Sequence, residues 1–260
     1  MNILFIGDIV GKPGRRILLD LLDNLKRENE IAFTLANAEN AAGGVGLNPE
    51  LADELLHSGI DLLTSGNHVF RYKEIFEYME RENRLIRPLN YPPGAPGKGM
   101  WTGKISSGDR ISVINLQGRT FMDPVDCPFR AADDALGQLN HDAKIKLVDF
   151  HAEATSEKTA LGWHLNGSVS AVIGTHTHIQ TADERVLSRG TAYITDAGMT
   201  GAIDSVIGVE IKSALDRFLT GLHHRFKPAK NNPRLNGVVI SIDRKTGNAT
   251  AIKRVNCGLP

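Results

Sequence analysis

Polar side chains able to bind a metal or move a proton recur where short apolar segments end. They lie at or just beyond the carboxyl ends of segments typical of buried strands: Asp8, Asn37, Glu39, Asn40, Asn67, His68, His151, Glu153, His176 and His178. In α/β folds, ligands bind at this edge of the sheet. One such histidine is more often structural, but donors from several strands predict a metal centre with acid–base chemistry.

The donors outnumber the ligands of one metal ion. A single zinc ion takes about four ligands, whereas six strong donors are present: Asp8, Glu39, Asn67, His151, His176 and His178. We therefore predict two metal ions, with the Glu39 carboxylate able to bridge them. Two ions ~3.5–4 Å apart hold the attacking and leaving oxygens of a displacement at phosphorus, and a hydroxide between them attacks at neutral pH. The predicted substrate is a small phosphate ester.

Two short motifs give these donors separate roles. In "GTHTH", His176 and His178 are two residues apart, so on an extended strand their side chains point to the same side, ~6.5–7 Å apart, and reach different ions. In "SGNH", His68 follows Asn67 and is expected to point the other way, toward the substrate, as a general acid; a helix cap or a core hydrogen bond is the alternative. Glu153 and Thr175 either orient the histidines or simply pack.

Alternating strand and helix signals organise the chain. Strand, loop and helix patterns occur three times, with helices expected over 15–28, 49–59 and 72–82, and residues 87–103 are expected to form a loop. Further strands are expected at 110–118, 143–151, 169–178, 236–243 and 248–255, with a helix at 156–164 and a hairpin around 188–190. We expect one domain over residues 1–260.

Composition limits the partners. The formal net charge is zero, which argues against binding duplex DNA, and the two cysteines, far apart, predict neither disulfides nor a thiolate metal site. The amino terminus lacks the pattern of a signal peptide or a membrane span, so a cytoplasmic protein without a membrane partner is expected. We also expect a homo-oligomer. The loop at 198–208 could line the substrate pocket or a subunit interface. The basic segment at 223–234 is expected to face solvent or another subunit, with RNA binding as the alternative.

Several blocks resemble a known family. "FIGDIVGKPGR", "NAENAAGG", "TSGNHVF", "DFHAEATSEK", "GTHTHIQTAD" and "TDAGMTG" resemble the YmdB-type bacterial phosphodiesterases, a subgroup of the calcineurin-like metallophosphoesterases. The resemblance implies an α/β sandwich of mixed β-sheets flanked by α-helices. The D-x-H and G-D-x-x-D motifs of the wider superfamily are replaced here by Asp8-Ile9-Val10 and "NAEN", as in the subgroup.

The resemblance also implies roles for individual residues. One metal ion would be bound by Asp8, Glu39, Asn40 and His178, and the other by Glu39, Asn67, His151 and His176. His68 would be the general acid, and the implied activity is hydrolysis of cyclic nucleotides of the 2′,3′-cyclic AMP class. The ions would be divalent or of mixed valence, with iron favoured and manganese or zinc as alternatives.

Two other functions fit the same residues. One is a phosphomonoesterase of the same fold, which differs only in substrate. The other is a regulatory protein that binds a cyclic nucleotide or an RNA end without hydrolysing it. Because a protein that only binds has no use for an acid facing the phosphate, His68 favours an enzyme.

Overall fold

The structure is a computed structural model that describes residues 1–139, 143–223 and 226–259. Its elements, in chain order, are β1 (Asn2–Ile6), β2 (Asp8–Ile9), α1 (Gly11–Glu28), β3 (Ile31–Asn37), α2 (Pro49–His57), β4 (Leu62–Thr64), α3 (Glu74–Arg81), β5 (Met100–Lys104), β6 (Arg110–Gln117), α4 (Pro128–Gln138), β7 (Ile145–His151), α5 (Thr155–His164), β8 (Ala171–Thr175), β9 (Arg185–Val186), β10 (Ala192–Ile194), β11 (Met199–Ala202), α6 (Ile211–Thr220), β12 (Pro233–Ile242) and β13 (Ala249–Gly258).

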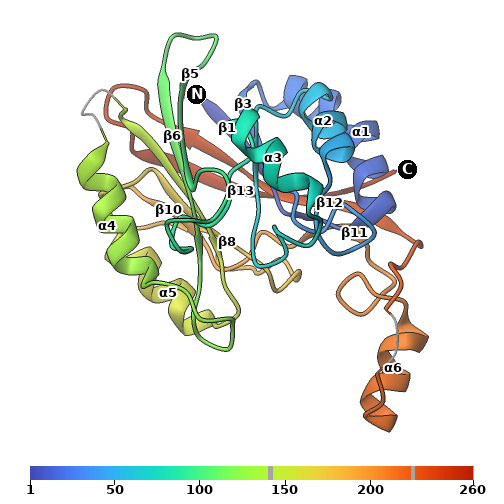
Figure 1. The fold of residues 1–260 in the computed structure, drawn as a ribbon. Helices are drawn as coiled ribbons and strands as arrows, with labels where there is room; N and C mark the ends of the chain where they lie inside the picture. Colours follow the sequence, from blue (N-terminus) through green and yellow to red (C-terminus); the bar gives the residue numbers. More distant parts are fainter. Residues whose placement is uncertain (140–142, 224–225, 260) are drawn as a thin grey trace.

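Two mixed sheets form the centre of the molecule (Figure 1). The first runs β2-β11-β12-β1-β3-β4, with β13 also paired to β12, and the second runs β5-β6-β7-β8-β10-β9. Strands β1, β3 and β4 are parallel, as are β6, β7, β8 and β10, whereas β5, β9 and β12 pair antiparallel to their neighbours. The carboxyl ends of the parallel strands therefore carry the polar residues that the sequence predicted there.

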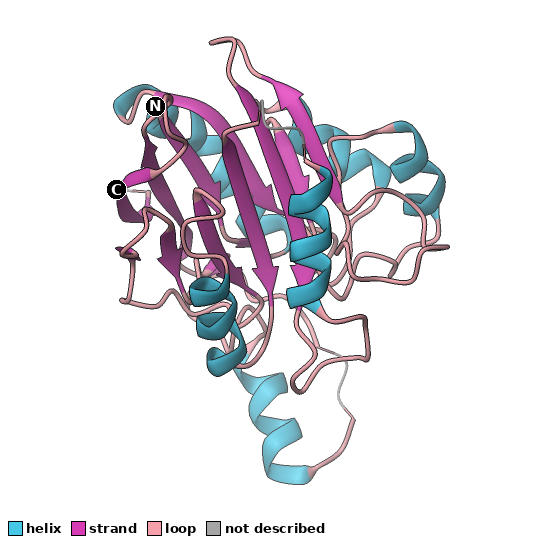
Figure 2. Cartoon of the chain, turned by 90° about the vertical axis from the view of Figure 1, so that its left-hand side faces the viewer, coloured by secondary structure: helices cyan, strands magenta, loops and turns pink. Residues whose placement is uncertain are grey.

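Three apolar clusters fill the layers. One lies between the two sheets and includes Phe5 and Phe33 from the first sheet and Leu147 from the second. A second cluster packs α1, α2 and α3 on the outer face of the first sheet, and a third packs α4 and α5 on the second. Figure 2 shows helices on both sides of the strands. This sandwich agrees with the predicted fold class, while the single domain over 1–260 stays a prediction.

One expected loop is wrong in its last part. Residues 100–103 belong to β5, which pairs antiparallel with β6. The Trp101 ring stacks on Phe33, with ring centroids 5.6 Å apart. The prolines that predicted a loop end at Pro96, and Gly103 is the one glycine of this stretch that lies within β5. Partial burial of Trp101 against the core between the sheets favours the strand. No helix within the described ranges is long and apolar enough to cross a membrane.

Candidate metal centre

The carboxyl ends of several strands bring the predicted ligands together. Asp8 begins β2, His151 is the last residue of β7, and His176 follows β8 directly. Glu39 and Asn40 follow β3, and Asn67 lies in the turn after β4. Glu39, Asn40, Asp8 and His151 are all nearly inaccessible to solvent. Because buried carboxylates are costly without a partner of opposite charge, this arrangement requires a cation or protonated groups.

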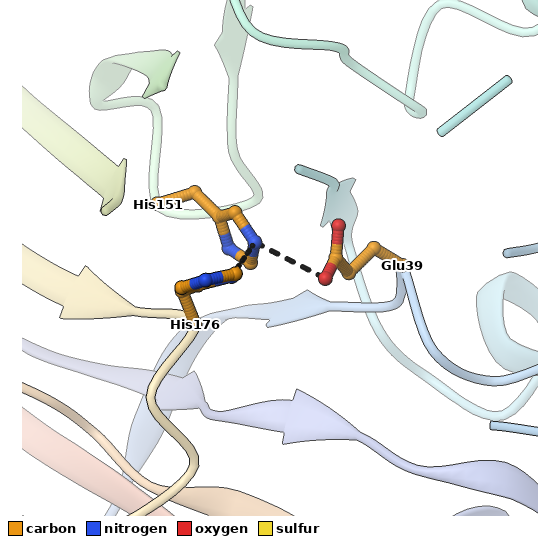
Figure 3. A group of neighbouring side chains, drawn as sticks. All are labelled: Glu39, His151 and His176. Carbon is orange, nitrogen blue, oxygen red and sulfur yellow. Dashed lines mark hydrogen bonds and ion pairs between the residues drawn. The ribbon is translucent and has the colours of Figure 1, made fainter. Parts of the chain in front are cut away.

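His151 lies at the centre of the group. Its Nε2 atom is 3.1 Å from Glu39 Oε1, 3.0 Å from Asn67 Oδ1 and 3.0 Å from His176 Nδ1. Figure 3 shows the side chains of Glu39, His151 and His176 pointing toward one another. Among the described residues, these three form the one group of His, Cys, Asp or Glu whose ligand atoms all lie within 4.8 Å of one another. They are three of the four residues predicted to bind one metal ion, the fourth being Asn67.

Asp8 lies beside this group with one oxygen unused. Its Oδ2 atom accepts a hydrogen bond from the backbone N–H of His176, at 3.1 Å. Its Oδ1 atom is buried without a hydrogen-bond partner among the described residues, 3.8 Å from His151 Nδ1. Buried carboxylate oxygens normally have partners. A bound cation would provide the partner that Asp8 Oδ1 lacks.

Asn40 joins Glu39 to the remaining predicted ligand. Its Nδ2 atom donates to Glu39 Oε1, at 3.1 Å, and faces His178 Nε2, at 3.2 Å. Its Oδ1 atom faces His68 Nδ1, at 3.0 Å. In this orientation Asn40 presents nitrogen to His178. A half-turn of the amide would present the oxygen instead, which is the atom that a metal requires.

Each of the three candidate histidine ligands has its outer nitrogen occupied. The Thr175 hydroxyl donates its proton to Asp149 Oδ1, at 2.7 Å, so it accepts from His151 Nδ1, at 2.9 Å. His176 Nε2 faces the Glu153 carboxylate, at 3.2 Å, and His178 Nδ1 donates to the Ile207 carbonyl, at 2.8 Å. These acceptors fix which nitrogen carries the proton. The other nitrogen of each ring, His151 Nε2, His176 Nδ1 or His178 Nε2, is the one that faces the remaining candidate ligands.

The backbone of the "THTH" segment differs from the expectation. Strand β8 ends at Thr175, and both histidines have positive φ angles, 96° for His176 and 67° for His178. The side chains therefore do not project from an extended strand, and the expected geometry, with both on one side of such a strand, is wrong. Histidine is among the few residues other than glycine that adopt this region with some frequency. Thr177, between the two histidines, is turned toward Asp196, because its backbone N–H and hydroxyl donate to Asp196 Oδ2, at 3.1 and 2.7 Å.

His68 was expected to point away from Asn67, toward the substrate, but it also contacts the candidate ligand Glu39 directly. Its backbone N–H donates to Glu39 Oε2, at 3.0 Å, and its ring Nδ1 is 3.3 Å from Glu39 Oε1. Asn67 and His68 lie in a turn, where the alternation of a strand does not apply, so both side chains face the centre. The His68 side chain is 36% exposed, and its Nε2 has no hydrogen-bond partner among the described residues.

Opposing influences set the charges of the group. Burial would raise the pKa of Glu39, but His151 and His68 lower the pKa of this carboxyl well below its usual value. Burial opposes a charge on His151 as well, yet Glu39, Asp8 and Asp149 raise the pKa of His151 to about 9. For His176, burial and then His151 lower the pKa to about 3. Without a metal, therefore, a proton on His151 balances Glu39; metal ligation replaces such protons.

A buried carboxylate that was not predicted supports His151. Asp149 accepts hydrogen bonds from Thr175 and Thr64, and from Asn37 Nδ2 at 3.0 Å. Burial raises the pKa of Asp149 to about 6. A signal for its role was available in "DFH", because residues two apart on a strand share a face and Asp149 therefore lies on the same side as His151.

A buried ion pair, also not predicted, holds the segment between the histidines. Lys158 Nζ lies 2.7 Å from Asp196 Oδ2, and neither side chain is appreciably exposed. Asp196 binds Thr177 through this oxygen and the Gly198 N–H through the other, at 2.8 Å. Lys158 was not predicted because lysine in an amphipathic helix is usually exposed.

Gly66 provides the space in which two candidate ligands meet. A Cβ atom at this position would lie 2.2 Å from His151 Cδ2 and 2.4 Å from Glu39 Oε2, too close for either side chain to stay in place. We expect Gly66→Ala to lower metal affinity by about 10- to 100-fold, the range found when the support of a ligand is disturbed. Calorimetric titration with Mn²⁺ measures this.

Gly94→Ala is the matched control for Gly66→Ala. A Cβ atom at Gly94 would meet no atom within 4 Å, and its φ is not positive. Metal affinity in this variant should equal that of the wild type. Equal affinity in both variants would show that the space at Gly66 is not needed for the site.

A profile of the YmdB-like protein family matches residues 4–255. The chain belongs to the YmdB-like family. This confirms the resemblance predicted from the motifs. The YmdB-like chain is 48% identical, over 255 residues, to the 2′,3′-cyclic-nucleotide 2′-phosphodiesterase of Bacillus subtilis strain 168, and the match covers 98% of this chain and 96% of that relative.

Two solved structures resemble the YmdB-like chain along its whole length. A hypothetical protein from Thermus thermophilus is 42% identical, with a TM-score of 0.94 and complete coverage of both chains. A novel phosphatase from Mycoplasma pneumoniae is 32% identical, also with a TM-score of 0.94, and the match covers 99% of this chain and 93% of that one. The phosphatase match confirms the predicted metallophosphoesterase fold.

Proposed function

We propose that the chain is a metal-dependent phosphodiesterase and that its substrates are cyclic nucleotides of the 2′,3′-cyclic class. The observation that carries this proposal is the common arrangement of His151, His176 and His178, each with an acceptor on its outer nitrogen and the other ring nitrogen directed into the group of candidate ligands. The name of the Bacillus subtilis relative supports the reaction and the substrate class.

The donors fit two divalent ions. The contacts around His151 support one ligand set, Glu39, Asn67, His151 and His176. The unused oxygen of Asp8 and the Asn40–His178 contact support the other, Asp8, Glu39, Asn40 and His178. When bound, such ions supply Lewis-acid stabilisation of charge on phosphate and lower the pKa of an attacking water. Oxygen and imidazole donors suit iron, manganese or zinc, and iron remains our proposal.

His68 is proposed to protonate the departing oxygen of the ester. Its Nδ1 proton has acceptors in Asn40 Oδ1 and Glu39 Oε1, and Glu39 would remain as an acceptor if the Asn40 amide turned. The protonated ring therefore keeps Nε2–H for donation, and this nitrogen has no partner in the described chain. Partial exposure of the ring lets a substrate reach it.

His68→Ala should lower kcat on 2′,3′-cyclic AMP by about 10²- to 10⁴-fold, the range for loss of a general acid. The metal content should stay that of the wild type, because a proton donor is not a ligand. Initial rates and elemental analysis of the same preparation measure both. His57→Ala, on the surface of α2, is the control and should change neither. Loss of metal together with activity would make His68 a ligand instead.

A phosphomonoesterase is the second candidate, because the Mycoplasma pneumoniae structure is described as a phosphatase. Rates on bis-p-nitrophenyl phosphate and on p-nitrophenyl phosphate separate the two. We expect the diester, and 2′,3′-cyclic AMP over 3′,5′-cyclic AMP, to be the faster substrates. Faster hydrolysis of the monoester would favour the phosphatase. Tight nucleotide binding without turnover in metal-loaded protein would favour the regulatory alternative.

A further inference from the structure

A cavity of about 880 Å³ is bordered by one side of α1. The loop after β3, the start of α2, the turn before α3, the segment before β12 and the carboxyl end of the chain complete its walls. Figure 1 shows this end of the chain beside α1. The described part of the wall contains neither a proposed metal ligand nor His68. Because pockets of this volume commonly hold small molecules, the cavity is a candidate for a second binding site.

Positive charge collects in the wall. Three of its side chains carry a positive charge and make no hydrogen bond or ion pair with any described residue: Lys12, Arg16 and Lys230. A fourth cation, Arg15, is bound by Glu54, at 3.2 Å. Asp20 is the one carboxylate that the described wall contains. Since the formal net charge of the chain is zero, this local surplus favours an anionic ligand.

The positions of the three unpaired cations allow them to act on one ligand. Lys12 and Arg16 are four residues apart on α1, so they lie on the same face of the helix in successive turns. Lys230 comes from the segment before β12, which forms another part of the wall. An anion between α1 and this segment would therefore be contacted from two elements.

Most of the remaining wall is apolar, so the ligand should have an apolar part as well. Side chains from five segments contribute: Ile17, Leu51, Tyr72, Pro228 and Leu259. The Tyr72 ring is 37% exposed, and its hydroxyl donates to the Ala42 carbonyl, at 3.4 Å. Exposed aromatic rings of this kind provide surfaces on which nucleobases stack. Inorganic phosphate alone would leave this part of the cavity unused.

Two polar side chains beside the apolar surface have unused hydrogen-bonding atoms. Asn48 caps α2 by accepting from the Leu51 backbone N–H, at 3.0 Å, and its amide N–H groups have no partner among the described residues. The Asp20 carboxylate likewise has no described partner. An amide donor and a carboxylate acceptor can bind the ring nitrogens of a base and the hydroxyls of a ribose.

We propose that the cavity is an effector site for a nucleoside 5′-diphosphate, with the phosphates bound by the three unpaired cations and the base against Tyr72. A diphosphate of this kind carries about three negative charges near neutral pH, which the cations match. The base and the ribose use the apolar surface and the polar atoms of Asn48 and Asp20. Binding in the cavity does not rest on the proposed function, whereas an effect on the rate of hydrolysis does.

Two segments connect this cavity with the candidate metal centre. Ala42 lines the cavity and lies two residues after the candidate ligand Asn40. Ala229, also in the wall, donates its backbone N–H to the Gly208 carbonyl, at 2.8 Å. Gly208 directly follows the residue whose carbonyl binds His178. A nucleotide in the cavity would contact both segments, so its binding should change the rate at the metal centre.

The first test is calorimetric titration of the full-length, metal-loaded protein with ADP, for which we expect a Kd of about 100 µM or lower. Arg16→Glu with Lys230→Glu should raise this Kd at least about 100-fold, because each lost contact between a cation and a phosphate costs roughly 10-fold. Lys98→Glu with Lys253→Glu is the matched control. It makes the same change in net charge at exposed positions outside the wall and should leave the Kd unchanged.

Two variants of Tyr72 test the position of the base. Tyr72→Ala should raise the Kd for ADP roughly 5- to 100-fold, the effect of losing a ring on which a base stacks. Tyr72→Trp keeps a ring, so it should keep the affinity, and its fluorescence should fall as ADP binds. An unchanged Kd in Tyr72→Ala would overturn the proposal, because the cavity would then bind phosphate alone. So would an unchanged Kd in the Arg16 and Lys230 double variant, which would place ADP at the metal centre, or a wild type that binds no ADP.

A second experiment measures initial rates on bis-p-nitrophenyl phosphate with and without saturating ADP. The kcat/KM of the wild type should change by roughly 5-fold or more, and that of the Arg16 and Lys230 double variant should not change. An unchanged rate of the wild type at saturating ADP would overturn the effector role. A wild type that does not hydrolyse the diester even without ADP would contradict the proposed function instead, and the titrations would still test the cavity.

Discussion

Glu39→Gln is expected to remove metal and activity together. The Glu39 carboxylate contacts three other residues of the site. It lies 3.1 Å from both His151 and Asn40, and it contacts His68 through the ring and the backbone N–H of that residue. The amide keeps the size of the side chain but loses the negative charge that two cations would share. We expect kcat/KM to fall by more than the roughly 100-fold that loss of an outer partner causes.

Elemental analysis and rates on 2′,3′-cyclic AMP, from one preparation, test this result. Glu50→Gln makes the same chemical change at an exposed position in the first turn of α2 and should alter neither value. Hydrolysis that persists in a metal-free Glu39 variant would rule out the proposed mechanism. The metal content and kcat/KM of Glu153→Gln should lie between those of Glu39→Gln and Glu50→Gln, because Glu153 contacts the outer nitrogen of His176 and is 48% exposed.

Lys158→Met should lower the free energy of unfolding by about 3–5 kcal/mol, the cost of removing one partner from a buried ion pair. The methionine fills most of the lysine volume but leaves Asp196 buried and charged, with Thr177 and Gly198 as its remaining donors. Equilibrium unfolding in urea measures the change.

Two further variants test whether the loss of stability in Lys158→Met comes from the buried charge of Asp196. Lys212→Met also breaks an ion pair, but Lys212 is 86% exposed, so the loss should be below about 1 kcal/mol. Adding Asp196→Asn to Lys158→Met removes the stranded charge and should restore part of the stability. A loss below about 1 kcal/mol in Lys158→Met would show that the buried pair contributes little.

The position of the site followed from a simple topological rule. Parallel strands end at one edge, and the donors that followed apolar segments, such as Glu39 after β3 and His151 at the end of β7, are close together in the structure. Local periodicity also predicted α2 and α5 to within a residue or two. The roles of these residues as ligands remain proposals.

The details that failed depend on tertiary contacts. The left-handed backbone around His176 and His178 is held by Asp8, which binds the His176 N–H from 168 residues away, and by Asp196, which binds Thr177 from 19 residues away. Similarly, Ile207 became a partner of His178 only through folding. No local pattern encodes such contacts.

Helix α6 was not among the predicted elements, and a helix in the region of α4 was predicted without bounds, although local signals exist for both. Pro128 begins α4, and Gly221 follows α6. Both helices are short, and of the ten residues of α6 only Ala214 is buried, so the usual link between an apolar face and a core does not hold there. A helix that packs little against its own chain is hard to place from one sequence.

The positive φ angles of His176 and His178 lower the stability of the fold at two positions where the proposed activity requires an imidazole. A non-glycine residue in such a conformation costs on the order of 1–3 kcal/mol, and glycine would relieve it. Glycine, however, has no imidazole. Selection for a sturdier protein and selection for a working site would therefore favour different residues at these two positions, and a screen for thermal stability alone should drive both toward glycine.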